Sequence, residues 1–155
     1  RHSQVRMSFL GTGCLEAEVH ADFEPSVRDR VEVTPRYSRD SLPTLLKGHH
    51  IKLFPTLSEG FSVALVEAMA CGLVPVTTTT PGPMEIVSDT VNGILMPPRD
   101  SQAIVEALER LICDRSYLDR LRRGAYETAQ NYSWKQIAAN TLILYEQALA
   151  KKMSQ

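Results

Sequence analysis

Two carboxylates around a strand–helix junction carry the strongest chemical signal in this sequence. Glu59 and Glu67 are separated by seven residues. The run 51–54 predicts a strand, and Ser62 is a suitable N-cap for a helix over residues 63–71. Glu59 therefore falls in the loop between them, whereas Glu67 lies inside the helix, about 7 Å along its axis from Ser62.

The start of such a helix suits a phosphate or a diphosphate. Backbone N–H groups without an internal acceptor meet the positive end of the helix dipole there, and Gly60 lets the backbone approach a ligand closely. A carboxylate accepts paired hydrogen bonds from neighbouring hydroxyl groups, so one glutamate could lie beside a sugar while the other reaches a ribose across the phosphates. The spacing alone favours two solvated surface glutamates, so the flanking residues decide between the two interpretations.

Strands that alternate with helices are needed to position these groups, and the sequence predicts them. Apolar and β-branched runs predict strands at residues 7–10, 31–34, 51–54, 74–78 and 94–96. Helices are expected at residues 16–28, where Pro25 limits the helix, and at residues 42–47 and 63–71, with one helical turn at residues 85–87. This alternation indicates the α/β class, a Rossmann-like parallel sheet with helices on both faces. Ligands bind beyond the carboxyl ends of such strands, here the loops after Leu10, Thr34, Phe54 and Thr78.

A C-terminal helical region, about residues 100–155, is expected to hold three helices. Asp100 and Ser133 are suitable N-caps for the first and third, and the second covers about residues 117–130. Apolar residues recur with a period near 3.6 in the first and third helices, which predicts that both pack into the core. In the third helix this face includes Trp134, Tyr145 and Leu149.

Length and composition indicate one globular domain over residues 1–155. The chain is 43% hydrophobic and 23% charged with a net charge of -1, which offers no basic surface for nucleic acid. No segment approaches the roughly 18 apolar residues that a membrane span needs. Cys14, Cys71 and Cys113 are far apart and odd in number, which indicates reduced thiols in a compartment such as the cytoplasm. Because the sequence opens on Arg1 and reaches an apolar run almost at once, we expect a fragment of a larger protein.

Two short motifs suggest other chemistry, and each departs from its pattern. The turn at residues 11–13 follows a strand, and Glu32 lies at a plausible distance for a ribose, as in dinucleotide-binding enzymes. Glu16 stands where the third glycine of that motif belongs, so we do not favour a dehydrogenase. His49 and His50 could bind a metal, but no carboxylate or cysteine stands at ligand spacing, so no metal site is expected.

The second C-terminal helix carries a cluster of arginines. Its simplest interpretation is a solvated basic face. The alternative is peripheral contact with an anionic membrane surface or a lipid-linked acceptor. The cluster consists of Arg115, Arg120, Arg122 and Arg123.

Several motifs occur in a fixed order along the chain. Residues 58–61 read Ser-Glu-Gly-Phe, and residues 67–76 read Glu-Ala-Met-Ala-Cys-Gly-Leu-Val-Pro-Val. Glu-Ile-Val follows at residues 85–87, Asn-Gly-Ile-Leu-Met-Pro-Pro-Arg-Asp at residues 92–100, and Tyr-Ser-Trp at residues 132–134. Together they resemble the Glu-x7-Glu signature and flanking motifs of retaining glycosyltransferases of the GT-B fold, in particular family 4. The resemblance runs from about residue 7 to residue 149.

This resemblance implies that residues 1–155 are the nucleotide-sugar-binding, C-terminal half of a two-domain transferase. Its substrate would be a nucleoside diphosphate sugar, such as a UDP-sugar or a GDP-sugar, with no metal and no cofactor. Glu59 would be the catalytic residue that faces the donor sugar, Glu67 would hold the ribose hydroxyls, and residues 34–36 would flank the base. The donor-binding residues implied are Gly11, Gly13, Thr34, Pro35, Arg36, Gly60, Phe61, Ser62, Val63, Ala64 and Glu67.

The sequence also departs from the family pattern. The family carries a basic pair in an earlier strand–loop–helix unit, where it neutralises the leaving diphosphate, and no matching segment precedes Met7. The N-terminal acceptor-binding domain is also outside this sequence, so the chain alone is expected to be inactive. Thr34-Pro35 replaces a usual glycine, and residues 81–84 replace the usual Gly-Gly-x-Pro. A GT-B nucleotide-sugar epimerase and a non-catalytic nucleotide- or partner-binding domain remain as alternatives.

Overall fold

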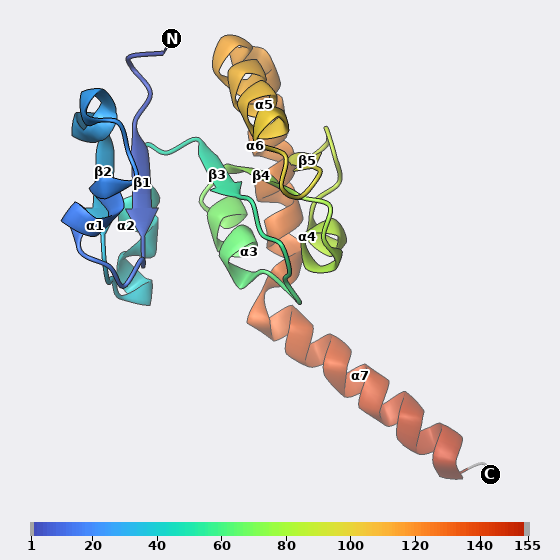
Figure 1. The fold of residues 1–155 in the computed structure, drawn as a ribbon. Coiled ribbons are helices and arrows are strands. Elements are labelled where there is room, and N and C mark those ends of the chain that lie inside the picture. Colours follow the sequence, from blue (N-terminus) through green and yellow to red (C-terminus); the bar gives the residue numbers. More distant parts are fainter. Residues whose placement is uncertain (1, 154–155) are drawn as a thin grey trace. The chain divides into compact units, whose positions relative to one another are not determined.

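The structure is a computed structural model that describes residues 2–153. It divides into two compact units, residues 1–47 and residues 48–155, each with its own parallel sheet (Figure 1). The five strands lie where the sequence predicts them. They are β1 (Met7–Leu10), β2 (Val31–Thr34), β3 (Ile51–Phe54), β4 (Val74–Thr78) and β5 (Ile94–Met96).

The first unit is built on two parallel strands. β1 pairs with β2 in a register that runs from Met7 opposite Val31 to Leu10 opposite Thr34. Two short helices, α1 (Glu16–Ala21) and α2 (Leu42–Leu46), accompany them. The predicted helix over residues 16–28 is wrong in its second half, where a 3₁₀ helix (Pro25–Arg30) begins instead. Pro25 has no N–H and starts this new turn at its first position, where none is needed.

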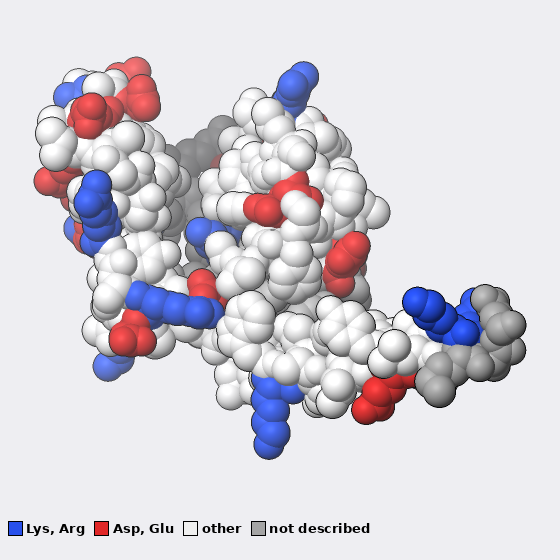
Figure 2. Space-filling model, turned by 90° about the horizontal axis from the view of Figure 1, so that it is seen from below, with Lys and Arg blue, Asp and Glu red and all other residues white. Residues whose placement is uncertain are grey.

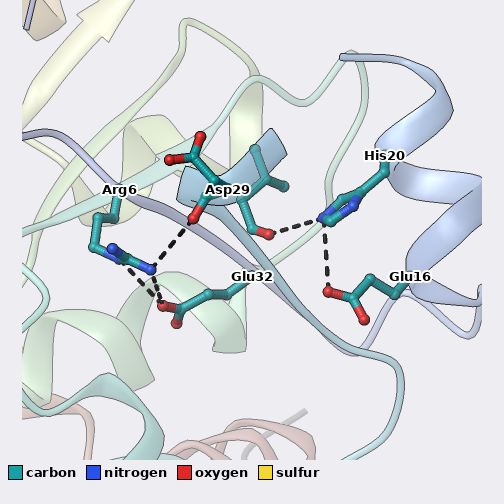
Figure 3. Close-up of polar contacts among 6 residues, drawn as sticks. Arg6, Glu16, His20, Asp29 and Glu32 are labelled. Carbon is teal, nitrogen blue, oxygen red and sulfur yellow. Dashed lines mark hydrogen bonds and ion pairs between the residues drawn. The ribbon is translucent and has the colours of Figure 1, made fainter. Parts of the chain in front are cut away.

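Polar contacts tie the elements of this unit together (Figure 3). The Nη2 atom of Arg6 lies 3.0 Å from a carboxylate oxygen of Glu32 and 3.5 Å from the carbonyl oxygen of Asp29. The Nε2 atom of His20 in α1 lies 2.9 Å from the carbonyl oxygen of Val31. Glu32 therefore pairs with an arginine of its own unit, which gives no support to the dinucleotide interpretation.

The second unit contains a three-stranded parallel sheet in the order β3-β4-β5. Every residue of β4 is buried, as expected for the central strand. Lys52 lies on β3, an edge strand of this sheet, and its side chain is half-buried. Burial lowers the pKa of Lys52, and its ammonium group lies 5.7 Å from the centre of the Phe54 ring.

Four helices cover this sheet or pack beside it (Figure 1). They are α3 (Val63–Ala70), α4 (Pro81–Ile86), α5 (Ser101–Cys113) and α6 (Arg115–Ala129). One apolar cluster joins β4 and β5 to α5 and α6, with Leu111 and Leu121 fully buried. A second cluster joins α3 and α4 to α6 around Leu65 and Met69. The α/β class and the Rossmann-like parallel fold predicted from the sequence are confirmed.

The helix ends follow the predicted caps in most places. The carboxylate of Asp100 accepts the Ala103 N–H at 2.9 Å, and Gly72 adopts a positive φ of 78° just after α3. The single turn predicted at residues 85–87 is displaced, because α4 already begins at Pro81. A proline at the first helical position has its φ preset for the helix, which explains the earlier start.

The last helix, α7 (Trp134–Met153), contradicts the prediction that its apolar face is buried. Trp134 is 65% exposed, Tyr145 66% and Leu149 62%. In Figure 1 α7 extends away from the rest of the second unit, and in Figure 2 most of the α7 surface that faces the viewer is uncharged. The period near 3.6 correctly indicated a helix, but no other element of the described chain covers this apolar surface. No described helix is both long enough and apolar enough to span a membrane.

Candidate functional site

The loop between β3 and α3 ends at an exposed helix N-terminus. Ser62 is 2% exposed, and its hydroxyl oxygen accepts the Leu65 N–H at 3.4 Å, as an N-cap does. Val63 and Ala64, which form the first turn of α3, are exposed. The Val63 N–H donates to the Phe61 carbonyl oxygen at 3.2 Å, whereas the Ala64 N–H belongs to a turn that lacks intrahelical acceptors. The carboxyl end of β3 therefore presents a helix N-terminus that can receive an anion.

Along the chain, one glutamate precedes this N-terminus and the other follows it. Glu59 is half-buried in the preceding loop, and Glu67 is half-buried within α3. Gly60 and Phe61, between Glu59 and the helix, are exposed. The structure thus brings the predicted residues 59–67 together on one loop and one helix.

Two threonines at the carboxyl end of β4 hold the end of β3 and the loop that follows it, and neither was predicted as a site residue. The hydroxyl of Thr77 donates to the Phe54 carbonyl at 2.9 Å, and the hydroxyl of Thr78 donates to the Thr56 carbonyl at 2.5 Å. Both threonines are buried. The signal was a threonine run at the end of a buried strand, where a hydroxyl needs a hydrogen-bond acceptor.

The other predicted donor-binding residues meet in the first unit, at the carboxyl ends of β1 and β2. Gly11 and Gly13 have φ values of 75° and 68°, a conformation that favours glycine. The Gly11 N–H donates to the Thr34 carbonyl at 2.8 Å, and the Gly13 N–H donates to the Pro35 carbonyl at 3.0 Å. Arg36 follows on the surface. The predicted site residues therefore form two groups, one in each unit, and their individual roles stay predictions.

Residues 4–128 match the family model described as glycosyl transferases group 1. The chain belongs to this family. The resemblance drawn from the sequence motifs is therefore confirmed at the level of the family.

Relatives of this group 1 domain include proteins named as glycosyltransferases. A D-inositol 3-phosphate glycosyltransferase from Salinispora tropica is 33% identical over 125 residues, which cover 81% of this chain and 26% of the relative. One of the same name from Xylanimonas cellulosilytica is 33% identical over 155 residues, covering 96% of this chain and 37% of the relative. The chain thus spans between a quarter and two-fifths of the length of these relatives.

Solved structures show the same fold. HepE from Anabaena in complex with UDP matches with a TM-score of 0.76 and 24% identity, covering 94% of this chain and 41% of that one. Sucrose-phosphate synthase from Thermosynechococcus elongatus matches with a TM-score of 0.75 and 21% identity, covering 96% of this chain and 47% of that one. These matches establish that the group 1 domain shares its Rossmann-like architecture with glycosyltransferases.

The histidine pair and the arginine cluster, which suggested other chemistry, both have neighbours within the second unit that account for them. Burial and the charges of Arg122 and Arg115 lower the pKa of His50. Arg122 donates from Nε to the Gly72 carbonyl at 2.8 Å, and Arg120 lies over the Tyr117 ring, 5.1 Å from its centre. Among the described residues, no group of three or more histidine, cysteine or acidic side chains is arranged to hold a metal.

The Cys71 thiol lies near Glu67, and its pKa depends on the charge of that residue. Burial, and then the negative charge of Glu67, raise the pKa of the Cys71 thiol. A raised pKa favours the neutral thiol, and only the thiolate reacts with alkylating reagents. We expect the alkylation rate of Cys71 to reach half its maximum at a higher pH in the folded chain than in the urea-unfolded chain.

Mass spectrometry of iodoacetamide-labelled peptides across a pH series would measure this shift. Glu67→Gln should move the Cys71 midpoint part of the way back, since it removes the charge but not the burial. Cys14 and Cys113, which are exposed, serve as internal references for reagent activity. Identical midpoints for Cys71 in the folded and unfolded chains would contradict the prediction.

Proposed function

We propose that this chain binds the donor of a retaining glycosyltransferase, a nucleoside diphosphate sugar whose sugar is transferred to a hydroxyl acceptor. The observation that carries the proposal is the exposed N-terminus of α3 with Glu59 before it and Glu67 within it. An anion at this N-terminus would have one carboxylate on each side. A nucleoside diphosphate sugar has this order of groups, with the diphosphate between two polyhydroxylated rings.

In this mechanism the chain binds and orients the donor. The first turn of α3, Val63 and Ala64, would face the diphosphate with the Ala64 N–H as a donor, and Gly60, Phe61 and Ser62 would line the sugar and the adjoining phosphate. The carboxylate of Glu59 would face the sugar near the anomeric carbon, and Glu67 would accept hydrogen bonds from the ribose hydroxyls.

The first unit carries the residues that the family resemblance assigns to the base. The turn of Gly11 and Gly13 and the segment 34–36 lie at strand carboxyl ends, where ligands bind in open parallel sheets. In the reaction, the bond from the anomeric carbon to the diphosphate breaks, and a bond to the acceptor oxygen forms as its proton leaves. The family resemblance implies that the anomeric configuration is retained.

The relatives support a nucleotide sugar as the substrate class. The HepE structures contain UDP in one case and UDP-glucose in another. Because the chain spans only part of its relatives, we assign acceptor binding to a further domain of the whole protein. The three cysteines are free thiols, in keeping with a reaction in the cytoplasm or at the cytoplasmic face of a membrane.

Titration of the ¹⁵N-labelled chain with UDP, GDP, UDP-glucose and GDP-mannose tests the proposal. We expect at least one to bind with a dissociation constant in the high micromolar to millimolar range, as an order of magnitude. This range assumes that the chain lacks a basic clamp for the diphosphate, because each charge-assisted hydrogen bond contributes roughly 1.5–3 kcal/mol. Amide shifts should include residues 59–67. Saturable shifts confined to other regions, or no binding by any of the four, would refute it.

A further inference from the structure

The loop that carries Glu59 rests directly on the backbone of α4. The Gly82 N–H donates to the Glu59 carbonyl oxygen at 3.2 Å. A methyl group at position 82 would lie 2.7 Å from that oxygen and closer still to the Gly60 carbonyl oxygen. Real β-carbons essentially never approach other atoms so closely. Gly82 is thus the point at which the loop and α4 pack without a side chain between them.

A second contact holds the same loop at the next residue, Phe61. The ring of Tyr132, in the 3₁₀ helix between α6 and α7 (Gln130–Tyr132), packs on the ring of Phe61 with their centres 5.7 Å apart. The Tyr132 hydroxyl donates to the Glu85 carbonyl oxygen of α4 at 3.3 Å. Tyr132 therefore links Phe61 to the helix that also carries Gly82.

The burial of α4 and of the Glu59 loop indicates which of the two would move if they were pushed apart. Gly82, Pro83 and Ile86 of α4 are buried, whereas Gly60 and Phe61 of the loop are exposed. Displacing α4 would disturb the apolar cluster that includes Ile86, while displacing the loop would cost little buried contact. A side chain at position 82 should therefore move the loop rather than the helix.

We propose that Gly82 and Tyr132 are positioning residues for the loop that carries Glu59. They set where Glu59 and the backbone of residues 60–61 lie relative to the first turn of α3. Neither residue touches the ligand in this proposal, and both act through the loop. The inference rests on the proposed function, because it takes this loop as the part that contacts the donor sugar. It adds that α4 and the 3₁₀ helix after α6 determine where that contact is made.

Gly82→Ala is the test. Without any ligand, the amide signals of residues 58–61 should shift, because the new methyl group displaces the loop. With ligand, the dissociation constant of the nucleotide sugar should rise about tenfold relative to that of the matching free nucleoside diphosphate, as expected from losing about one hydrogen bond to the sugar. The probe is whichever of UDP-glucose and GDP-mannose binds the wild-type chain more tightly. A general loss of stability would weaken the binding of both ligands alike and leave the ratio of their dissociation constants unchanged.

Gly124→Ala is the matched control. A methyl group at position 124 would lie 2.5 Å from the Val91 carbonyl oxygen, a clash with backbone similar to that at position 82 but between α6 and another loop. It should destabilise the chain without moving the signals of residues 58–61 or the ratio of dissociation constants. If it changes both as Gly82→Ala does, or if Gly82→Ala changes neither, the positioning role is wrong.

Variants of Tyr132 keep the proposal testable if Gly82→Ala does not fold. Tyr132→Ala removes the ring contact with Phe61 and should shift the same loop signals, whereas Tyr132→Phe keeps the ring and should restore most of the wild-type spectrum. Unchanged amide signals of residues 58–61 in Tyr132→Ala would show that Tyr132 does not position the loop. A wild-type chain that binds no nucleotide would refute the proposed function alone, because the ligand-free spectra still decide whether these residues position the loop.

Discussion

Glu67→Ala should weaken the binding of UDP or GDP to this chain by about ten- to a hundredfold, whereas Glu59→Ala should leave it nearly unchanged. Glu67 lies within α3, on the side assigned to the ribose, and its carboxylate would accept hydrogen bonds from the ribose hydroxyls. Losing a hydrogen bond to a charged group costs roughly 1.5–3 kcal/mol, which corresponds to this change in affinity. Glu59 is assigned to the sugar, which a free nucleoside diphosphate lacks.

NMR titration of the wild-type chain and both variants would measure the difference. Glu59→Ala should instead reduce the affinity for the nucleotide sugar alone, whereas Glu67→Ala should weaken the binding of both ligands, because both contain the ribose. Urea unfolding of each variant checks that the fold persists at the titration conditions. Equal losses of nucleoside diphosphate affinity in the two variants would refute the assignment of roles.

Leu121→Ala should lower the free energy of unfolding by about 2–5 kcal/mol, the usual range for leucines in well-packed cores. Leu121 lies in α6, is fully buried and belongs to the cluster that joins α5 and α6 to the sheet. Since single domains are stable by only about 5–15 kcal/mol, this one change should remove a large share of the stability.

Leu144→Ala is the matched comparison, because it removes the same side chain from α7, where Leu144 is 63% exposed. Its effect should stay within about 0.5 kcal/mol, as for most surface substitutions. Urea unfolding followed by far-ultraviolet circular dichroism is the suitable measurement, because the single tryptophan, Trp134, is itself 65% exposed. A loss at Leu144 as large as the loss at Leu121 would show that α7 is packed in solution.

These two leucines illustrate what periodicity can predict. A helix was predicted at both places, for α7 from apolar residues every three or four positions, and both helices exist. Burial depends on a second surface that packs against the apolar one. For α6 the second surface is the sheet with α5 and α3, whereas for α7 no element of the described chain supplies it.

The site divides in a similar way. Local rules sufficed for the strand 51–54, for the Ser62 cap and for the helix that carries Glu67, because each depends on residues close in sequence. The same rules failed within residues 16–28, where a 3₁₀ turn that begins at Pro25 replaces the second half of the expected helix, and at Pro81, where α4 begins earlier than the turn predicted at residues 85–87.

The amino-acid sequence by itself determined the α/β class, the strands and most helix boundaries, and the placement of Glu59 and Glu67 on either side of a helix N-terminus. These features follow from hydrophobic period, capping and turn chemistry, which act over a few residues. Only the tertiary structure showed that Thr78, Gly82 and Tyr132 hold the loop of Glu59. They stand 19 or more positions away from Glu59 in the sequence, and only the folded chain brings residues so far apart into contact.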